Sequence, residues 1–262
     1  MQKKGAWTVK ILLYISFLGT NYRGYQIQKG CPTVQGTLCE AAQKVFGVKC
    51  DITGCSRTDS GVHANMFCAT VSESGKSGLY TTIPIEKIPI AFGCVLPQDV
   101  TVFLAREVED SFHPRYDVKY KEYVYRIYTA PVSNPFFADR SWHYPRGIDD
   151  AALERMKDGA RRFCGKHDFA AYMASGSDIK DTVRTVFDAE VTREGDFVEF
   201  RVSADGFLYN MVRILTGTLV GIAEGRISPE DVDAITASRD RKLAGVTAPA
   251  KGLYLNRVVY KE

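Results

Sequence analysis

The chain has 262 residues, of which 45% are hydrophobic and 25% are charged. This composition supports a buried core, either in one large domain or in two joined halves, and argues against wholesale disorder. The formal net charge of +3 does not establish a polyanionic partner, but it permits one if the basic side chains gather on one face.

The first part of the chain mixes strand and helix patterns around a loop punctuated by glycine. Residues 9–18 are apolar and mostly alternating, which predicts a strand. Thr33 is expected to cap the helix that follows, and Gly47 to end it. The other elements expected here are strands at 51–56, 64–72 and 100–108, a Gly/Ser/Lys loop at 74–82 and a short helix at 83–92.

The second part shows strands and helices in a similar order, without a visible sequence repeat. Because strands and helices do not alternate strictly, we predict an α+β fold with mixed or antiparallel sheets. The polar, Pro-containing stretch 109–118 predicts a boundary between domains at residues 1–110 and 111–262. The elements expected after it are strands at 120–128, 183–193, 197–202 and 253–260 and helices at 149–164, 207–223 and 229–237.

The cysteines and the N-terminus indicate where the protein works. Seven cysteines without a CxxC pair favour reduced thiols in a cytosolic protein. A zinc site from Cys50, Cys55 and His63 is an alternative, but the spacing fits no common ligand pattern. We expect neither a signal peptide nor a membrane helix, because no apolar segment follows MQKKGAW and no long apolar span occurs. The expected location is the cytoplasm.

The segment GCSRTDSGVHA, residues 54–64, concentrates polar and charged groups between glycines. Arg57 and Asp59 project from the same face if the segment is extended. A nearby guanidinium favours the ionised carboxylate, which suits a nucleophile or base better than a general acid. Taken alone, the pattern is more typical of a surface turn with a local ion pair. A hydrolase using Ser60 and His63 is poorly supported, because no GxSxG elbow surrounds the serine.

Two other segments offer groups that RNA chemistry requires. The strand YKEYVYRIY places Tyr123 and Tyr125 on one face beside basic residues, which could stack on a base or simply pack in the sheet. Arg213 interrupts the apolar segment ADGFLYNMVRILTGTLVGIA. A buried arginine needs an anion, for which Asp59 is a natural candidate, unless the side chain reaches the surface.

These segments resemble the tRNA pseudouridine synthase A (TruA) family over nearly the whole chain. GCSRTDSGVHA is similar to the family box GRTDAGVHA, and YRGYQIQ with TVQGTLCEA is similar to its N-terminal signature. FHPRYDVKYKEYVYRIY, PFFADRSWHY, GKHDFAAY, GFLYNMVRILTGTL and APAKGLYL follow in the family's order. The departures, among them Ser60 for the usual Ala and Val246 for the usual Pro, remove no charged or aromatic residue of the pattern.

The resemblance implies an isomerase that converts uridine to pseudouridine at positions 38, 39 and 40 in the anticodon stem-loop of tRNA, without cofactor or metal. The family's catalytic Asp corresponds to Asp59, and its uracil-stacking Tyr to Tyr123. Arg57 and Arg213 match basic residues near the catalytic Asp. Leu253 matches an apolar residue of the substrate pocket.

The implied fold is two similar ferredoxin/RRM-like halves, each a mixed or antiparallel sheet with helices on one face. The halves join into one continuous sheet with a central catalytic cleft, and the implied partners are tRNA and a second copy in a homodimer. Two alternatives stay open: a pseudouridine synthase acting on other RNA positions, and a non-catalytic RNA-binding module. The presence of Asp59, Arg57 and Tyr123 together argues against the second.

Overall fold

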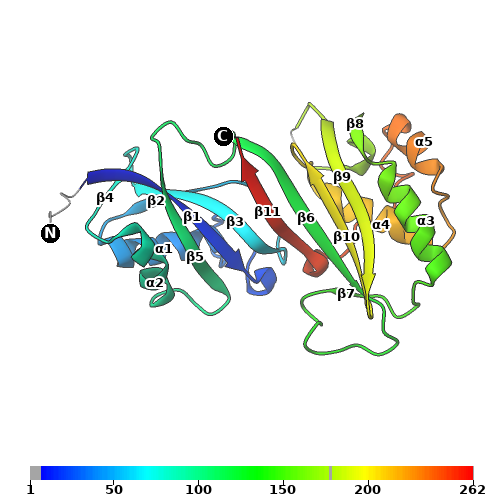
Figure 1. The fold of residues 1–262 in the computed structure, drawn as a ribbon, viewed down its shortest axis with the longest axis horizontal. Coiled ribbons are helices and arrows are strands. Elements are labelled where there is room, and N and C mark those ends of the chain that lie inside the picture. The colour runs from blue at the N-terminus through cyan, green and yellow to red at the C-terminus, as the bar shows by residue number, and fades with distance from the viewer. Residues whose placement is uncertain (1–6, 177–178, 262) are drawn as a thin grey trace. The chain divides into compact units, whose positions relative to one another are not determined.

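The structure, a computed structural model, describes residues 7–176 and 179–261 (Figure 1). Within these residues the chain forms two compact units. The first runs as far as Lys119 and also contains the C-terminal segment from Leu255 on, and the second is Tyr120–Tyr254. Both units combine strands with helices, which confirms the predicted α+β composition.

The first unit contains a sheet of antiparallel pairs centred on its first strand. Its strands are β1 (Trp7–Phe17), β2 (Cys50–Gly54), β3 (His63–Glu73), β4 (Leu79–Thr81), β5 (Val100–Val108) and most of β11 (Leu253–Tyr260). β3, β4 and β5 pair with β1, β2 pairs with β3, and β11 neighbours β3. The expected loop at 74–82 therefore contains a strand, because Leu79 and Tyr80 pair with the start of β1.

The helices of the first unit follow the predicted caps. α1 (Val34–Phe46) begins at Thr33, whose side chain accepts a hydrogen bond from the Gly36 N–H. It ends at Gly47, which has a φ of 72°, a left-handed conformation that glycine adopts at little cost. The expected helix at 83–92 is divided into a 3-10 turn (Ile85–Lys87) and α2 (Ile88–Gly93).

The second unit contains a sheet in the order β6-β10-β9-β8, in which a short strand, β7, pairs in parallel with β6. The strands are β6 (Val118–Tyr128), β7 (Trp142–His143), β8 (Gly165–Asp168), β9 (Val183–Glu194) and β10 (Phe197–Ala204). The predicted hairpin is confirmed, since β9 and β10 pair antiparallel from Glu194 and Phe197 onward. The sequence pattern missed β7 and β8, which are too short to show a period.

Three α-helices complete the second unit: α3 (Asp150–Arg161), α4 (Met211–Ala223) and α5 (Asp231–Ser238). α3 packs against both α4 and β9 (Figure 1). α4 does not begin at residue 207 as expected, because Asn210 has a φ of 60° and interrupts the helical path. No helix in the described part of the chain is long and apolar enough to cross a membrane.

The cysteines form no disulfide in the described part of the chain. Within residues 7–176 and 179–261, no group of three or more His, Cys, Asp or Glu side chains is placed to hold a metal ion. The zinc alternative built on Cys50, Cys55 and His63 therefore gains no support.

Candidate active site

Arg57 and Asp59 lie in the loop that connects β2 to β3, at residues 55–62. The Arg57 side chain is exposed, Thr58 is buried and Asp59 is half-buried. The Asp59 carbonyl accepts a hydrogen bond from the Val62 N–H at 3.2 Å, which closes a turn. We call residues 55–62 the Asp59 loop. It presents a carboxylate and a cation from a short stretch of backbone.

Residues 19–25 hold the Asp59 loop in place by hydrogen bonds and close backbone contacts. This segment includes the beginning of the YRGYQIQ signature. The Tyr25 N–H donates to the Thr58 carbonyl at 3.1 Å, and the Ser60 hydroxyl donates to the Tyr22 carbonyl at 3.2 Å. Gly24 has a φ of +89°, and a Cβ there would lie 2.7 Å from the Thr58 carbonyl oxygen. Only glycine combines this conformation with this close approach.

His63 provides a second attachment between the same two segments. Its side chain is fully buried, and its Nδ1 accepts a hydrogen bond from the Gly19 N–H at 2.9 Å. A ring that accepts at Nδ1 is neutral and carries its proton on Nε2. A Cβ on Gly19 would lie 2.0 Å from the Val62 carbonyl oxygen, so the two backbones touch here. His63 therefore joins the start of β3 to the segment at Gly19.

Tyr123 and Tyr125 lie on β6 in the second unit, and the structure separates their roles. Tyr125 is fully buried and its hydroxyl donates to the Pro249 carbonyl at 2.7 Å. Burial raises the pKa of this phenol, so Tyr125 is a neutral core residue. Tyr123 is 7% exposed, and its ring and that of Phe207 form a T-shaped pair with centroids 5.0 Å apart. Of the two rings, Tyr123 alone retains some access to solvent.

Arg213 lies in the first turn of α4 and is half-buried. Its Nε donates to the Ala248 carbonyl at 2.7 Å, and its Nη1 donates to Oδ1 of Asn210 at 2.6 Å. The carbonyl of Ala248 and the amide oxygen of Asn210 thus hold two of the guanidinium nitrogens. Leu253, 6% exposed, begins β11 after the turn at Ala250–Gly252. The structure therefore groups Arg57 with Asp59 in the first unit, and places Tyr123, Arg213 and Leu253 in the second.

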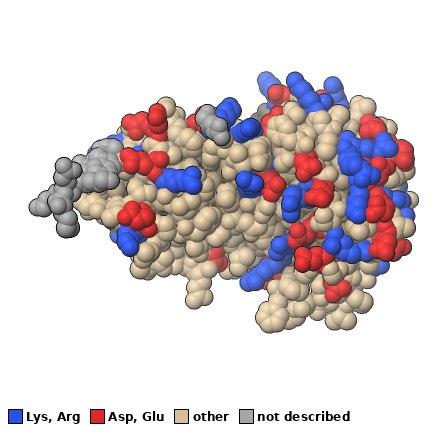
Figure 2. Space-filling model, viewed as in Figure 1, with Lys and Arg blue, Asp and Glu red and all other residues tan. Residues whose placement is uncertain are grey.

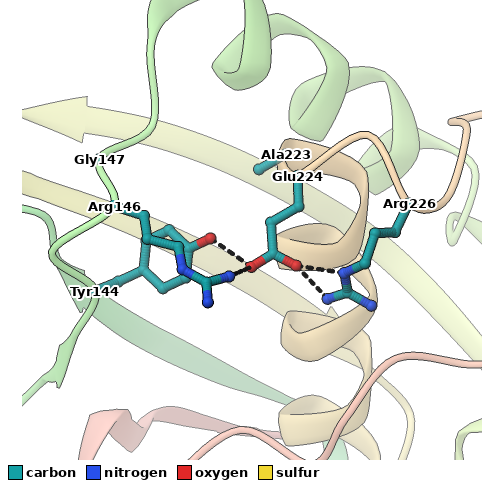
Figure 3. A pocket seen from close by; sticks show the side chains of 6 residues that line it. All are labelled: Tyr144, Arg146, Gly147, Ala223, Glu224 and Arg226. Atoms are coloured by element: carbon teal, nitrogen blue, oxygen red, sulfur yellow. Dashed lines mark hydrogen bonds and ion pairs between the residues drawn. The ribbon is translucent and has the colours of Figure 1, made fainter.

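A separate polar pocket of about 420 Å³ lies at the end of α4 in the second unit (Figure 3). Glu224 accepts hydrogen bonds there from the Tyr144 hydroxyl at 2.6 Å and from Arg146 at 2.9 Å, and it also pairs with Arg226. These contacts, the Tyr144 hydrogen bond foremost, lower the pKa of Glu224. The charged groups of the pocket bind one another and thereby hold the end of α4 in place. We call these contacts the Glu224 cluster. The pocket contains none of the predicted site residues.

The surface charges of the second unit are largely compensated on the face that Figure 2 shows, where basic and acidic side chains are interspersed. Arg162, for example, pairs with Asp233 at 2.6 Å and also with Asp158 and Glu230. The basic residues therefore do not gather into one patch on this face.

Comparison with known proteins decides the family. A family model described as tRNA pseudouridine synthase matches residues 160–261. The tRNA pseudouridine synthase A of Thermoanaerobacter sp. (strain X514) is 43% identical over 252 residues, which cover 95% of this chain and 99% of the relative. That of Acetivibrio thermocellus is 41% identical over 251 residues, with the same coverage. This chain belongs to the tRNA pseudouridine synthase A family.

The family assignment covers both units, since the relatives match 95% of the chain. Arg213 and Leu253 also lie within the interval of the family model, 160–261. Among solved structures, one titled "Crystal Structure of a Cbf5-Nop10-Gar1 Complex" covers 95% of this chain and 50% of that chain, with 14% identity and a TM-score of 0.37. A similarity at that level adds nothing to the family assignment.

The sequence did not predict the contacts that support the site. Gly19 and His63 join the two N-terminal motifs, and Asn210 orients Arg213. The glycines of the first loop indicated an unusual backbone conformation, but the sequence did not show which residues that backbone contacts. Asn210 gave no such signal, because it lies inside the helix that the sequence predicts at 207–223, whereas the observed helix begins at Met211.

Proposed function

We propose that this protein is a tRNA pseudouridine synthase that isomerises uridine to pseudouridine at positions 38, 39 and 40 of the anticodon stem-loop. The observation that carries the proposal is family membership, at 43% identity to a tRNA pseudouridine synthase A over 95% of this chain. The grip on the Asp59 loop supports it further, because a reactive carboxylate has to be held in a fixed position.

The isomerisation balances without an external reagent. The N1–C1′ bond of the uridine breaks, the uracil turns, and C5 forms the new bond to C1′. The proton that C5 loses is matched by the one that N1 gains, so nothing is oxidised or reduced. The protein must supply an ionised carboxylate and a pocket that retains the detached base and excludes water. We assign the carboxylate to Asp59, either as a nucleophile or as a base.

The substrate must leave the helical stack before it can react. Extruding a base costs a few kcal/mol, and stacking on an aromatic ring contributes about 1–3 kcal/mol per base. We assign this stacking to Tyr123 and an apolar contact with the nucleotide to Leu253. The exposed Arg57 and the half-buried Arg213 are assigned to the substrate, where guanidinium groups bind phosphate well.

The proposal includes an architecture. We propose two ferredoxin/RRM-like halves, residues 1–110 and 111–262, each a mixed or antiparallel sheet with helices on one face. The working protein is a homodimer in the cytoplasm that binds tRNA. Family membership supports these points.

Pseudouridine mapping in tRNA from cells that lack the protein tests the proposal. Loss at positions 38 to 40, restored by the wild-type gene, is the expected result. Loss at other RNA positions would change the substrate and keep the reaction. An unchanged pseudouridine pattern would contradict the proposed function.

A further inference from the structure

Asn210 combines two features that are uncommon at the start of a helix. Its backbone is left-handed, with a φ of 60° and a ψ of 9°, although it is not glycine. Its side chain makes no capping hydrogen bond to the helix backbone, which is the usual reason for an asparagine at this position. A residue that accepts an unfavourable backbone and gives up its capping bond calls for another explanation.

The Asn210 side chain is used on Arg213 instead. Its Oδ1 accepts a hydrogen bond from Nη1 at 2.6 Å, while the Ala248 carbonyl accepts from Nε at 2.7 Å. Bonds at two different nitrogens of a planar group fix its plane as well as its position. Asn210 thus adopts a left-handed backbone, makes no capping bond and instead helps to orient the Arg213 guanidinium.

The second anchor, Ala248, is held independently of Asn210. The Ala248 N–H donates to the Arg213 carbonyl at 3.1 Å, and the Gly245 N–H donates to the Thr218 hydroxyl at 2.9 Å. A Cβ on Gly217 would lie 1.8 Å from the Val246 carbonyl oxygen, so this segment lies directly on α4. Removing the Asn210 amide should thus remove the hydrogen bond to Nη1 and leave the surrounding backbone in place.

We propose that Asn210 is a positioning residue, which orients the Arg213 guanidinium for its contact with the RNA substrate. This inference rests on the proposed function, because it takes Arg213 to be a substrate-binding residue. The left-handed backbone places the amide at the start of α4, and the amide oxygen holds Nη1 against free rotation of the long side chain. A displacement of about 1 Å in such a group can lower the rate on the order of a hundredfold.

The variants Asn210→Gly and Asn210→Asp separate the backbone from the side chain. Glycine adopts the left-handed conformation without strain but lacks the oxygen. Aspartate tolerates the conformation and keeps an oxygen acceptor. We expect N210G to lower kcat for pseudouridine formation about tenfold or more, with little change in KM or in thermal stability. N210D should stay within about threefold of the wild type, because it rescues the lost acceptor.

A double-mutant cycle with Arg213→Ala tests whether Asn210 acts through Arg213. If it does, N210G should cause no further loss of kcat in the R213A background. Equal kcat values for N210G and the wild type, or the same loss from N210G with and without Arg213, would overturn the inference while wild-type turnover upholds the proposed function. Failure of the wild-type protein to form pseudouridine in a tRNA transcript would overturn both.

Discussion

The Asp59 loop of the first unit and Arg213, in the first turn of α4 in the second unit, are held in place in different ways. The loop is gripped by main-chain bonds and by glycine contacts with residues 19–25, so that its backbone has little freedom. Arg213 lies on a regular helix, and what is fixed there is the end of a long side chain, by Asn210 and Ala248. The first arrangement positions a short carboxylate, and the second orients a planar cation.

This difference follows from the side chains themselves. An aspartate has a short side chain, so its position is decided by the backbone, and a turn with close glycine contacts is an efficient way to set it. An arginine has a long flexible side chain that carries about 2 kcal/mol of rotamer entropy, so it needs bonds near its end. Variants of the Asp59 loop should therefore act through steric contacts, and variants around Arg213 should act through lost hydrogen bonds.

The largest effect should come from Asp59→Asn. The amide has the same shape as the carboxylate but neither acts as a nucleophile nor accepts a proton in its place. We expect the rate of pseudouridine formation to fall at least on the order of 10³-fold, with tRNA binding retained in a filter assay. Substantial turnover by this variant would move the chemistry away from the Asp59 loop.

Gly19→Ala should disturb the first region through sterics alone. The added Cβ would lie 2.0 Å from the Val62 carbonyl oxygen, so the two segments must separate. We expect the free energy of unfolding to fall by about 1–3 kcal/mol, with a loss of rate as the Asp59 loop shifts. Chemical denaturation measures the first effect and a single-turnover assay the second.

Gly93→Ala is the matched control for this steric prediction. Gly93 ends α2 and has nothing within 4 Å of its Cβ position, so alanine should change stability by less than about 1 kcal/mol. If both glycine variants behaved alike, the close contact at Gly19 would not be what fixes the loop.

The sequence predicted α1 and the β9–β10 hairpin because their signals are local. Thr33 and Gly47 act on the helix they bound, and the pairing of β9 with β10 follows from a short turn. The sequence missed β4, because Leu79 is ordered by pairing with β1, far away in the chain. Local patterns carry no information on such a partner.

The candidate site shows the same limit. Resemblance to a family singled out Asp59 and Arg213 as residues, but the contacts that position them join distant segments. The Gly19 N–H meets His63 across 44 positions, and Arg213 meets Ala248 across 35. The quoted motifs contained most of these residues, whereas the hydrogen bonds between the motifs required the fold.

A contrast within β6 should give the next effect, by comparing Tyr123→Leu with Tyr125→Leu. Loss of base stacking at Tyr123 should lower the rate about five- to hundredfold, since stacking contributes about 1–3 kcal/mol. Tyr125→Leu removes a fully buried ring and its bond to Pro249, so it should lower stability by about 3 kcal/mol. Rate assays and thermal unfolding on both variants separate the two roles. A rate loss in Tyr123→Leu that is explained by unfolding would return Tyr123 to the core.

The smallest effect should appear in the pH dependence of stability at the end of α4. The hydrogen bond from Tyr144, with smaller contributions from the arginines, lowers the pKa of Glu224 in the folded state below its ordinary value of 4.5. A carboxyl with a lowered folded pKa contributes stability that is present above about pH 4.5 and is lost as the pH falls through the folded value. Glu224→Gln should therefore be less stable than the wild type at pH 7 and should lose less stability on acidification. Because the Glu224 cluster contains none of the proposed site residues, the rate at pH 7 should not change. A rate loss comparable to that of N210G would show that the C-terminal end of α4 also affects the position of Arg213.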